Sequence, residues 1–197
     1  MRLWEFAIAA TIAEITPGPN MGYLVALALA QGRRAGLAAV AGVALGLSLL
    51  GVAAALGFGL LTQQVPYAGQ VLRWAGVAYL FWLAYEAWRG MDTAGDGEMA
   101  PSFRRGLTVN LLNPKAAVFY VAVLPLFLAP ADVGLSPQLW LTALYVLIAT
   151  GVHTGLVLGA SSLRGAFVES ERLVLFRRAA AVMMGCVALW FAWETRH

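Results

Sequence analysis

Thr16-Pro17-Gly18-Pro19-Asn20 lies in the middle of the first long apolar segment of the chain. Proline cannot donate a backbone hydrogen bond, and glycine lacks the side chain that restricts φ, so this stretch should interrupt a helix. A second interruption, Asn113-Pro114-Lys115, lies inside a later apolar segment. In hydrocarbon, freed backbone groups are tolerated only where they face protein or a water-filled cavity. Two interrupted segments in corresponding halves of a chain are typical of the binding site of a membrane transporter.

The composition is that of a membrane protein rather than a soluble domain. The chain is 61% hydrophobic and 12% charged, and its mean hydropathy is +0.76. It contains six apolar segments, each close to the length of about 20 residues that a bilayer requires. The sequence therefore predicts an all-α membrane protein with six transmembrane helices, of which the first and fourth are interrupted in mid-membrane. The expected spans are 3–31, 36–61, 66–88, 107–130, 138–162 and 176–194.

The spans fall into two halves of one transporter domain, residues 1–197. A polar, glycine-rich linker at about 90–106 separates a first repeat, about 1–89, from a second repeat, about 107–197. Because each half has an odd number of spans, the two repeats should be inverted relative to each other. Nine arginines lie in the connections after spans one, three and five, and none lies in the other two connections. The rule that cytoplasmic loops are positively charged then places both termini outside, in the periplasm.

Two ionisable residues are expected deep in the membrane. At about 1.5 Å per residue, Glu14 lies roughly 16 Å along its span and Lys115 roughly 12 Å along its own. A charge facing lipid costs about 2.5–3.5 kcal/mol on insertion scales, so both side chains should point inward. One interpretation is a Glu14–Lys115 ion pair that only joins two helices. The other is a functional site, which we prefer because both charges flank the helix breaks.

The breaks themselves could bind a zwitterion. Half-helices that begin at Pro19, after Gly18, and at Pro114, with Asn113 as N-cap, would present free N–H groups to an anion. The carbonyls released before Pro17 and Pro114 could accept from an ammonium group, as could the carboxylate of Glu14. Such a site suits a carboxylate at one end and an ammonium at the other.

Other polar residues extend this region of the sequence. Asn20, Asn110 and Asn113 add amide groups beside the breaks, although asparagines in spans also bond simply from helix to helix. His153 lies in the middle of the fifth span and is either a packing residue or a proton carrier, since the ordinary pKa of histidine is about 6.5. Glu14 is the first candidate for a proton site and His153 the second. For Glu14, desolvation and a nearby Lys115 act on the pKa in opposite senses, so the sequence leaves the outcome open.

Three segments in order resemble the LysE/RhtB family of amino-acid exporters, in particular its homoserine and threonine efflux branch. The resemblance covers essentially the whole chain and implies efflux of amino acids or close derivatives, driven by the proton-motive force across the bacterial inner membrane. It implies that Thr16 and Pro17 join the residues above at the substrate site. The segments are Thr16-Pro17-Gly18-Pro19-Asn20, Arg73-Trp74-Ala75-Gly76-Val77-Ala78-Tyr79-Leu80-Phe81-Trp82-Leu83, and Asn110-Leu111-Leu112-Asn113-Pro114-Lys115-Ala116, the last continuing to Leu124-Pro125.

The sequence argues against several other functions. The single cysteine, Cys186, excludes an internal disulfide, thiol-redox chemistry that needs two cysteines, and a cysteine-based metal cluster. No motif for an enzyme, a cofactor, a metal or nucleic acid is evident. The expected partners are an amino-acid substrate, protons and lipid, and glycines on exposed helix faces would permit a homodimer. The alternative function is that of a structural or receptor-like membrane subunit, which would leave the helix breaks unexplained.

Overall fold

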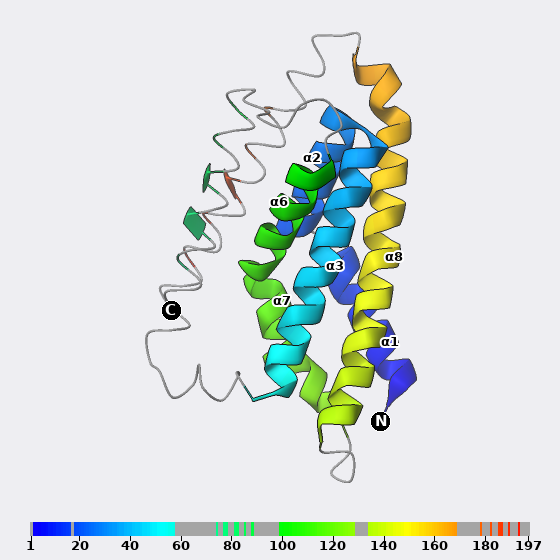
Figure 1. Cartoon of the computed structure of the whole chain (residues 1–197), viewed down its shortest axis with the longest axis vertical. Coiled ribbons are helices and arrows are strands. Elements are labelled where there is room, and N and C mark those ends of the chain that lie inside the picture. Colours follow the sequence, from blue (N-terminus) through cyan, green and yellow to red (C-terminus); the bar gives the residue numbers. More distant parts are fainter. Residues whose placement is uncertain are drawn as a thin grey trace.

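The computed structural model describes a bundle of helices, and the described residues contain no strand (Figure 1). The description covers four continuous stretches and scattered single positions further along the chain. The predicted third and sixth spans therefore lie largely outside the described residues, and the six-span inverted repeat stays a prediction. The described residues are 2–16, 18–57, 99–128 and 134–168, with single positions at 74, 77–78, 81–82, 85, 88, 178, 182, 185–186, 189 and 193.

The first predicted break is present. Helix α1 (Leu3–Ile15) ends before Thr16, whose backbone is extended, and α2 (Pro19–Gln31) begins immediately after Gly18, which is also extended. Proline is favoured at the first position of a helix because its φ is preset and its missing N–H is not needed there. Pro17 lies outside the described residues. The first apolar segment is thus two half-helices joined by a short extended connection.

The second break divides the predicted fourth span. Helix α6 (Met99–Leu111) is followed by α7 (Pro114–Val118), and the two halves of the segment are bent by 53°. Beyond α7 the backbone continues as the π-helix η1 (Phe119–Val123) and the 3₁₀-helix η2 (Leu124–Phe127). Segments of π and 3₁₀ helix inside a longer helix often mark functional sites or hinges.

The helix that precedes the second break begins earlier than the predicted fourth span. Helix α6 begins at Met99, whereas the sequence predicted a linker up to about 106 and a span from 107. The segment is polar, but its buried positions recur every three or four residues, so one face packs into the bundle while the charged face stays outside. These buried positions are Ser102, Gly106, Val109 and Asn110.

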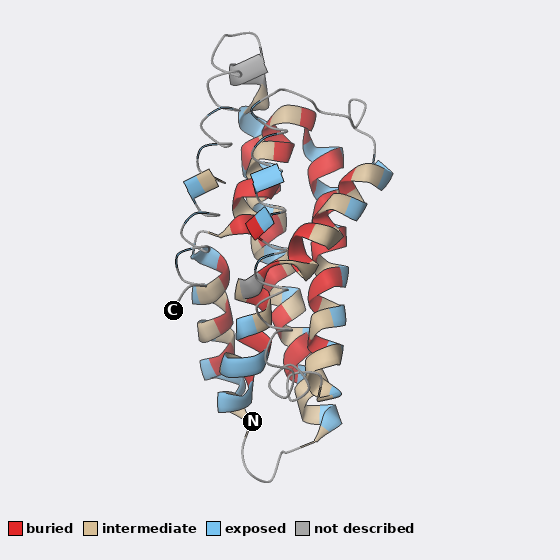
Figure 2. Ribbon diagram, turned by 90° about the vertical axis from the view of Figure 1, so that its left-hand side faces the viewer, coloured by how far each residue is buried: buried red, intermediate tan, exposed pale blue. Residues whose placement is uncertain are grey.

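Two long helices complete the described bundle. Both α3 (Arg33–Ala55) and α8 (Leu135–Val168) are long and apolar enough to cross a membrane, and the bent α6–α7 segment would make a third span. Helix α3 packs closely against α6 because both lack side chains where they cross. A methyl group at Gly42 would lie 2.0 Å from the carbonyl oxygen of Phe103, and one at Gly106 would lie 2.2 Å from the carbonyl oxygen of Ala39. Figure 2 shows the buried positions turned towards the interior of this bundle.

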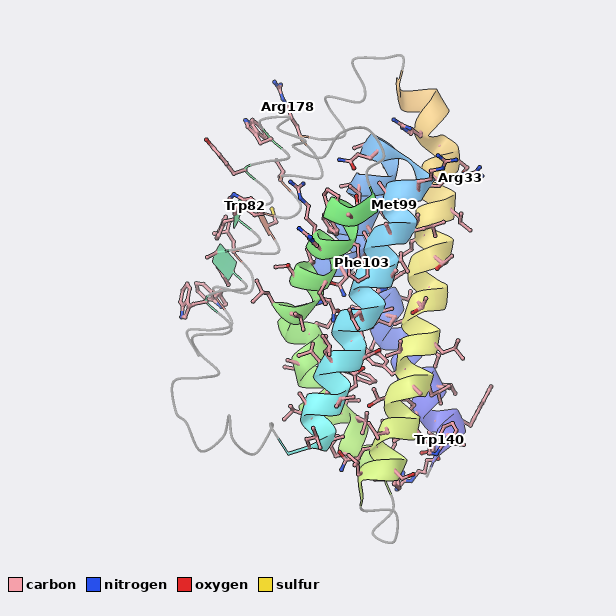
Figure 3. The ribbon with its side chains drawn as sticks, viewed as in Figure 1. Arg33, Trp82, Met99, Phe103, Trp140 and Arg178 are labelled. Carbon is pink, nitrogen blue, oxygen red and sulfur yellow. The ribbon has the colours of Figure 1, made fainter. Side chains whose placement is uncertain are left out.

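The two ends of the bundle differ in charge. Arg33 lies at the end where α2 meets α3, where α6 begins and where α8 ends, and Trp140 lies near the opposite end (Figure 3). We call the first the basic end, because Arg34, Arg104, Arg105 and Arg164 belong to the same helix ends. At the opposite end the backbone N–H of Arg2 donates to the carbonyl of Phe127 at 3.2 Å, which joins the start of α1 to the end of η2.

Candidate functional site

A small cavity lies where the two helix breaks meet. Its volume is about 10 Å³, roughly the space of one water molecule. It brings together residues from α1, both breaks, α2, α7 and α8, which are far apart in the sequence. The lining residues are Glu14, Gly18, Asn20, Met21, Asn113, Lys115, Ala116 and His153.

Glu14 lies in the last turn of α1 and is buried, with 5% of its surface exposed. Its Oε1 accepts a short hydrogen bond from the hydroxyl of Tyr145 on α8. Its Oε2 lies 3.1 Å from Nε2 of His153, which is ion-pair distance but does not satisfy hydrogen-bond geometry. The His153 side chain is buried, and its Nδ1 has no hydrogen-bond partner among the described residues. Glu14 is therefore held by two side chains of α8.

Lys115 lies on the other side of the same cavity. Its ammonium group donates to the carbonyl oxygen of Thr16 at 2.7 Å, so the carbonyl freed before Pro17 does bind an ammonium group, that of the protein itself. The structure contains no ion pair between Lys115 and Glu14, although both line the cavity. Gly18 lies directly beside this lysine, since a methyl group there would be in ordinary contact with Cδ at 3.4 Å and with Nζ at 3.6 Å.

The position of Lys115 is unfavourable for stability alone. Asn113 caps α7 as predicted, because its Oδ1 accepts from the backbone N–H of Lys115 at 3.0 Å. Lys115 is consequently in the first turn of α7 and faces the cavity near the first turn of α2, where the positive ends of helix dipoles disfavour a cation. An ammonium group has three N–H donors, and Thr16 is its only hydrogen-bond partner among the described residues. The remaining donors are available to an anion in the cavity.

A pair of asparagines joins the first half of the chain to the second. Nδ2 of Asn20 on α2 donates to Oδ1 of Asn110 on α6 at 2.8 Å, and both side chains are buried. Gly46 on α3 makes room for them, since a methyl group there would lie 2.7 Å from Nδ2 of Asn110. Within the described structure, Oδ1 of Asn20 and Nδ2 of Asn110 have no partner. The pair therefore holds α2 on α6 beside the cavity.

The remaining predicted residues differ in position. The side chain of Thr16 is exposed, and its hydroxyl donates to the carbonyl of Ile12 at 2.7 Å, so only its backbone takes part in the site. Pro19 is buried at the start of α2, and Pro114 is the first residue of α7. Tyr145, Met21 and Ala116 also belong to the site, and the sequence did not identify them as site residues. Tyr145 precedes His153 by eight positions on the buried face of α8, which was the available signal.

The fold and the site together define a helical, membrane-embedded protein with a small polar cavity at the meeting point of two helix breaks, which is the architecture of a transporter. The LysE type translocator family matches residues 11–195, and the chain belongs to this family. It is a transporter and not an enzyme.

Individual relatives bear the names of efflux proteins. The chain is 31% identical over 160 residues to the homoserine/homoserine lactone efflux protein of Salmonella typhimurium. The aligned region covers 77% of this chain and 78% of the relative. It is 32% identical over 124 residues to the leucine efflux protein of Klebsiella pneumoniae, and the aligned region covers 59% of this chain and 58% of the relative. It is 28% identical over 157 residues to the threonine efflux protein of Salmonella typhi, and the aligned region covers 75% of this chain and 76% of the relative. No solved structure matches the chain significantly.

Proposed function

We propose that this protein is a secondary active exporter of amino acids or amino-acid derivatives across the cytoplasmic membrane, and that it works by proton antiport. The observation that carries the proposal is that Lys115 and Glu14 line one small cavity without pairing with each other. The names of the relatives, which refer to homoserine and its lactone, leucine and threonine, support an amino-acid substrate.

The two charges match the two ends of an amino acid. The carboxylate of the substrate would bind the free donors of Lys115 and the N-terminus of α2, which begins at the cavity with 13 residues of aligned peptide dipoles. The ammonium group would bind Glu14, the only carboxylate among the described lining residues. A site with one fixed cation and one carboxylate favours a neutral zwitterion over a dibasic amino acid.

The substrate and a proton compete for Glu14, and this competition couples their movements across the membrane. A carboxylate that holds a proton cannot hold an ammonium group with the same strength, because its negative charge is lost. Glu14 therefore binds either the substrate or a proton, and movement of one outwards and the other inwards is antiport. His153, 3.1 Å from Glu14, is the neighbouring group to which the proton can pass.

The cavity is too small for the substrate in this conformation. With about 10 Å³ it has room for a water molecule, and even glycine is several times larger. Binding therefore requires the half-helices to separate on one side of the site at a time. The charge asymmetry of the two ends supports an inward-facing basic end and periplasmic termini, and two inverted three-helix repeats would provide the symmetry for alternating access.

Counterflow in proteoliposomes with a panel of radiolabelled amino acids tests the transport activity. Lys115→Met should lower the apparent affinity for the transported compound by roughly 10- to 150-fold, the effect of losing one hydrogen bond to a charged group. Lys115→Arg is the matched control, since it keeps the charge, and should retain part of the affinity. Wild-type affinity in Lys115→Met would refute the role of this lysine. A folded wild-type protein without counterflow for any compound would favour the structural or receptor-like alternative.

A second experiment tests the coupling. Glu14→Gln and His153→Asn are compared for exchange of substrate against substrate and for accumulation driven by an imposed pH gradient. A variant that has lost the proton site should still exchange but should no longer accumulate. If both variants accumulate substrate as well as the wild type, neither residue carries the proton.

A further inference from the structure

Aromatic side chains separate the cavity from the end of the bundle opposite the basic end. The ring of Tyr145 stacks on that of Phe119 with centroids 4.0 Å apart and planes 12° apart. Phe119 contacts Phe6 at 5.8 Å, and Phe6 contacts Phe127 edge-on at 5.4 Å. We call these four residues the aromatic cluster.

In each helix that contributes to the aromatic cluster, the aromatic residue lies between the cavity and the end of the bundle opposite the basic end. On α1, Phe6 is eight residues nearer to that end than Glu14, and on α8, Tyr145 is eight residues nearer than His153, which is roughly 12 Å at 1.5 Å per residue. Phe119 follows Lys115 in the same direction, and Phe127 lies at the end itself, beside Arg2. Phe6, Phe119 and Tyr145 are buried, so the cluster closes this side of the site.

The wall formed by Phe119 and Phe127 has an irregular backbone. Phe119 is the first residue of the π-helix η1, and Phe127 is the last residue of the 3₁₀-helix η2, which contains Pro125. Proline removes a backbone hydrogen bond, and π and 3₁₀ segments within a helix are common at hinges. This part of the wall is therefore the part best suited to change its helical winding when the site opens.

Tyr145 belongs to the aromatic cluster and also contacts the carboxylate of the charged site. Its ring stacks on Phe119 and its hydroxyl donates to Oε1 of Glu14. The charged or titratable groups near Glu14 in the described structure are Tyr145 and His153 from α8, Lys115 from α7 and Tyr120 from η1. The hydroxyl of Tyr145 thus occupies a position on the carboxylate that an ammonium group could take.

We propose that Tyr145 is a positioning residue that couples the occupancy of Glu14 to the opening of the aromatic cluster. When an ammonium group binds the carboxylate, it displaces the hydroxyl, and the ring of Tyr145 is no longer held against Phe119. The outward side of the site then opens only when the carboxylate has a ligand, which prevents opening of the empty site. This inference rests on the proposed export function, because the displacing group is that of the substrate.

The test measures access to the cavity from outside. In a Cys186→Ser background, Ala116→Cys places a thiol in the cavity lining, and a membrane-impermeant maleimide is added outside the vesicles. Tyr145→Phe keeps the ring and removes only the hydroxyl, so the labelling rate of the empty protein should rise roughly tenfold or more, as for loss of one hydrogen bond to a carboxylate. The matched control is Tyr120→Phe. Tyr120 is also buried beside Tyr145, but its hydroxyl has no partner among the described residues, so this variant should label within about twofold of the parent.

A second variant and the substrate response make the outcomes separable. Phe119→Leu removes the stacked ring and keeps the hydroxyl, so it should also speed labelling. A transported amino acid should speed labelling of the parent protein and should have little further effect on Tyr145→Phe. If Tyr145→Phe and Phe119→Leu label like the parent while counterflow is intact, this inference is wrong and the export function stands. If Tyr145→Phe and Phe119→Leu label faster than the parent but no compound in the panel is exchanged, the export function fails.

Discussion

The close crossing of α3 and α6 should make Gly42 one of the positions least tolerant of a side chain. In Gly42→Ala the new methyl group would lie 2.0 Å from the carbonyl oxygen of Phe103 and 2.8 Å from the backbone nitrogen of Leu107. Ordinary contacts begin near 3.4 Å, so the two backbones would have to separate by roughly 1.4 Å. Backbone atoms in a helix cannot rotate away as the end of a side chain can, so the helices themselves must move.

The expected cost follows from two opposing effects. Overpacking costs about 1–3 kcal/mol, whereas replacing glycine by alanine inside a helix gains about 0.5–1 kcal/mol, and the midpoints of the two ranges leave a net destabilisation of roughly 1 kcal/mol. At about 2–4 °C per kcal/mol for a chain of this size, the apparent melting temperature in detergent should fall by roughly 2–4 °C. The measurement is the melting temperature, with size-exclusion chromatography used to quantify the protein that remains folded after heating.

Gly155→Ala on α8 is the matched control. Gly155 is exposed, and among the described residues nothing lies within 4 Å of a methyl group placed there. The same substitution should therefore leave the melting temperature unchanged or raise it by the helix propensity alone. A Gly42→Ala protein that melts at or above the wild-type temperature would refute the close crossing of α3 and α6.

Three further experiments test a hydroxyl at the site, a buried contact and the orientation in the membrane. Thr16→Ala should leave counterflow within about twofold of wild type, because the hydroxyl is exposed and satisfied within its own turn; a tenfold loss would show that it binds the substrate. Asn20→Ala should lower stability by about 1–3 kcal/mol, because it leaves the partner amide buried without its bond, and an unchanged melting temperature would contradict this. After replacement of Cys186, a cysteine at exposed Leu56 should be labelled from outside and one at exposed Met99 from inside, and labelling of both from one side would overturn the proposed orientation.

The sequence predicted the breaks well because their causes are local. Proline lacks an N–H and glycine lacks a side chain wherever they occur, so the helix ends around Gly18 and Asn113 follow from the residues themselves. The start of α6 was missed for the opposite reason. Met99 begins a polar stretch that is helical because one face packs on α3, and composition alone does not reveal that partner.

The candidate site shows the same division. That Glu14 and Lys115 point inward follows from the cost of placing a charge in lipid, which any helix through the membrane must meet. The cost of a charge in lipid does not determine which groups Glu14 and Lys115 contact. The sequence left open an ion pair between them, whereas the structure joins Glu14 to Tyr145 and His153 and joins Lys115 to a backbone carbonyl.

The sequence by itself determined the class of protein and the two interruptions, because hydrophobicity, proline and glycine act within a few residues of the chain. The tertiary structure decided which groups meet. The contact from Glu14 to Tyr145 spans 131 positions and that from Lys115 to Thr16 spans 99 positions. Contacts of this kind depend on how helices cross, and the crossings depend on close approaches such as that at Gly42, where a single methyl group would change the distance between backbones. The spacing of residues along one helix carries no record of that distance.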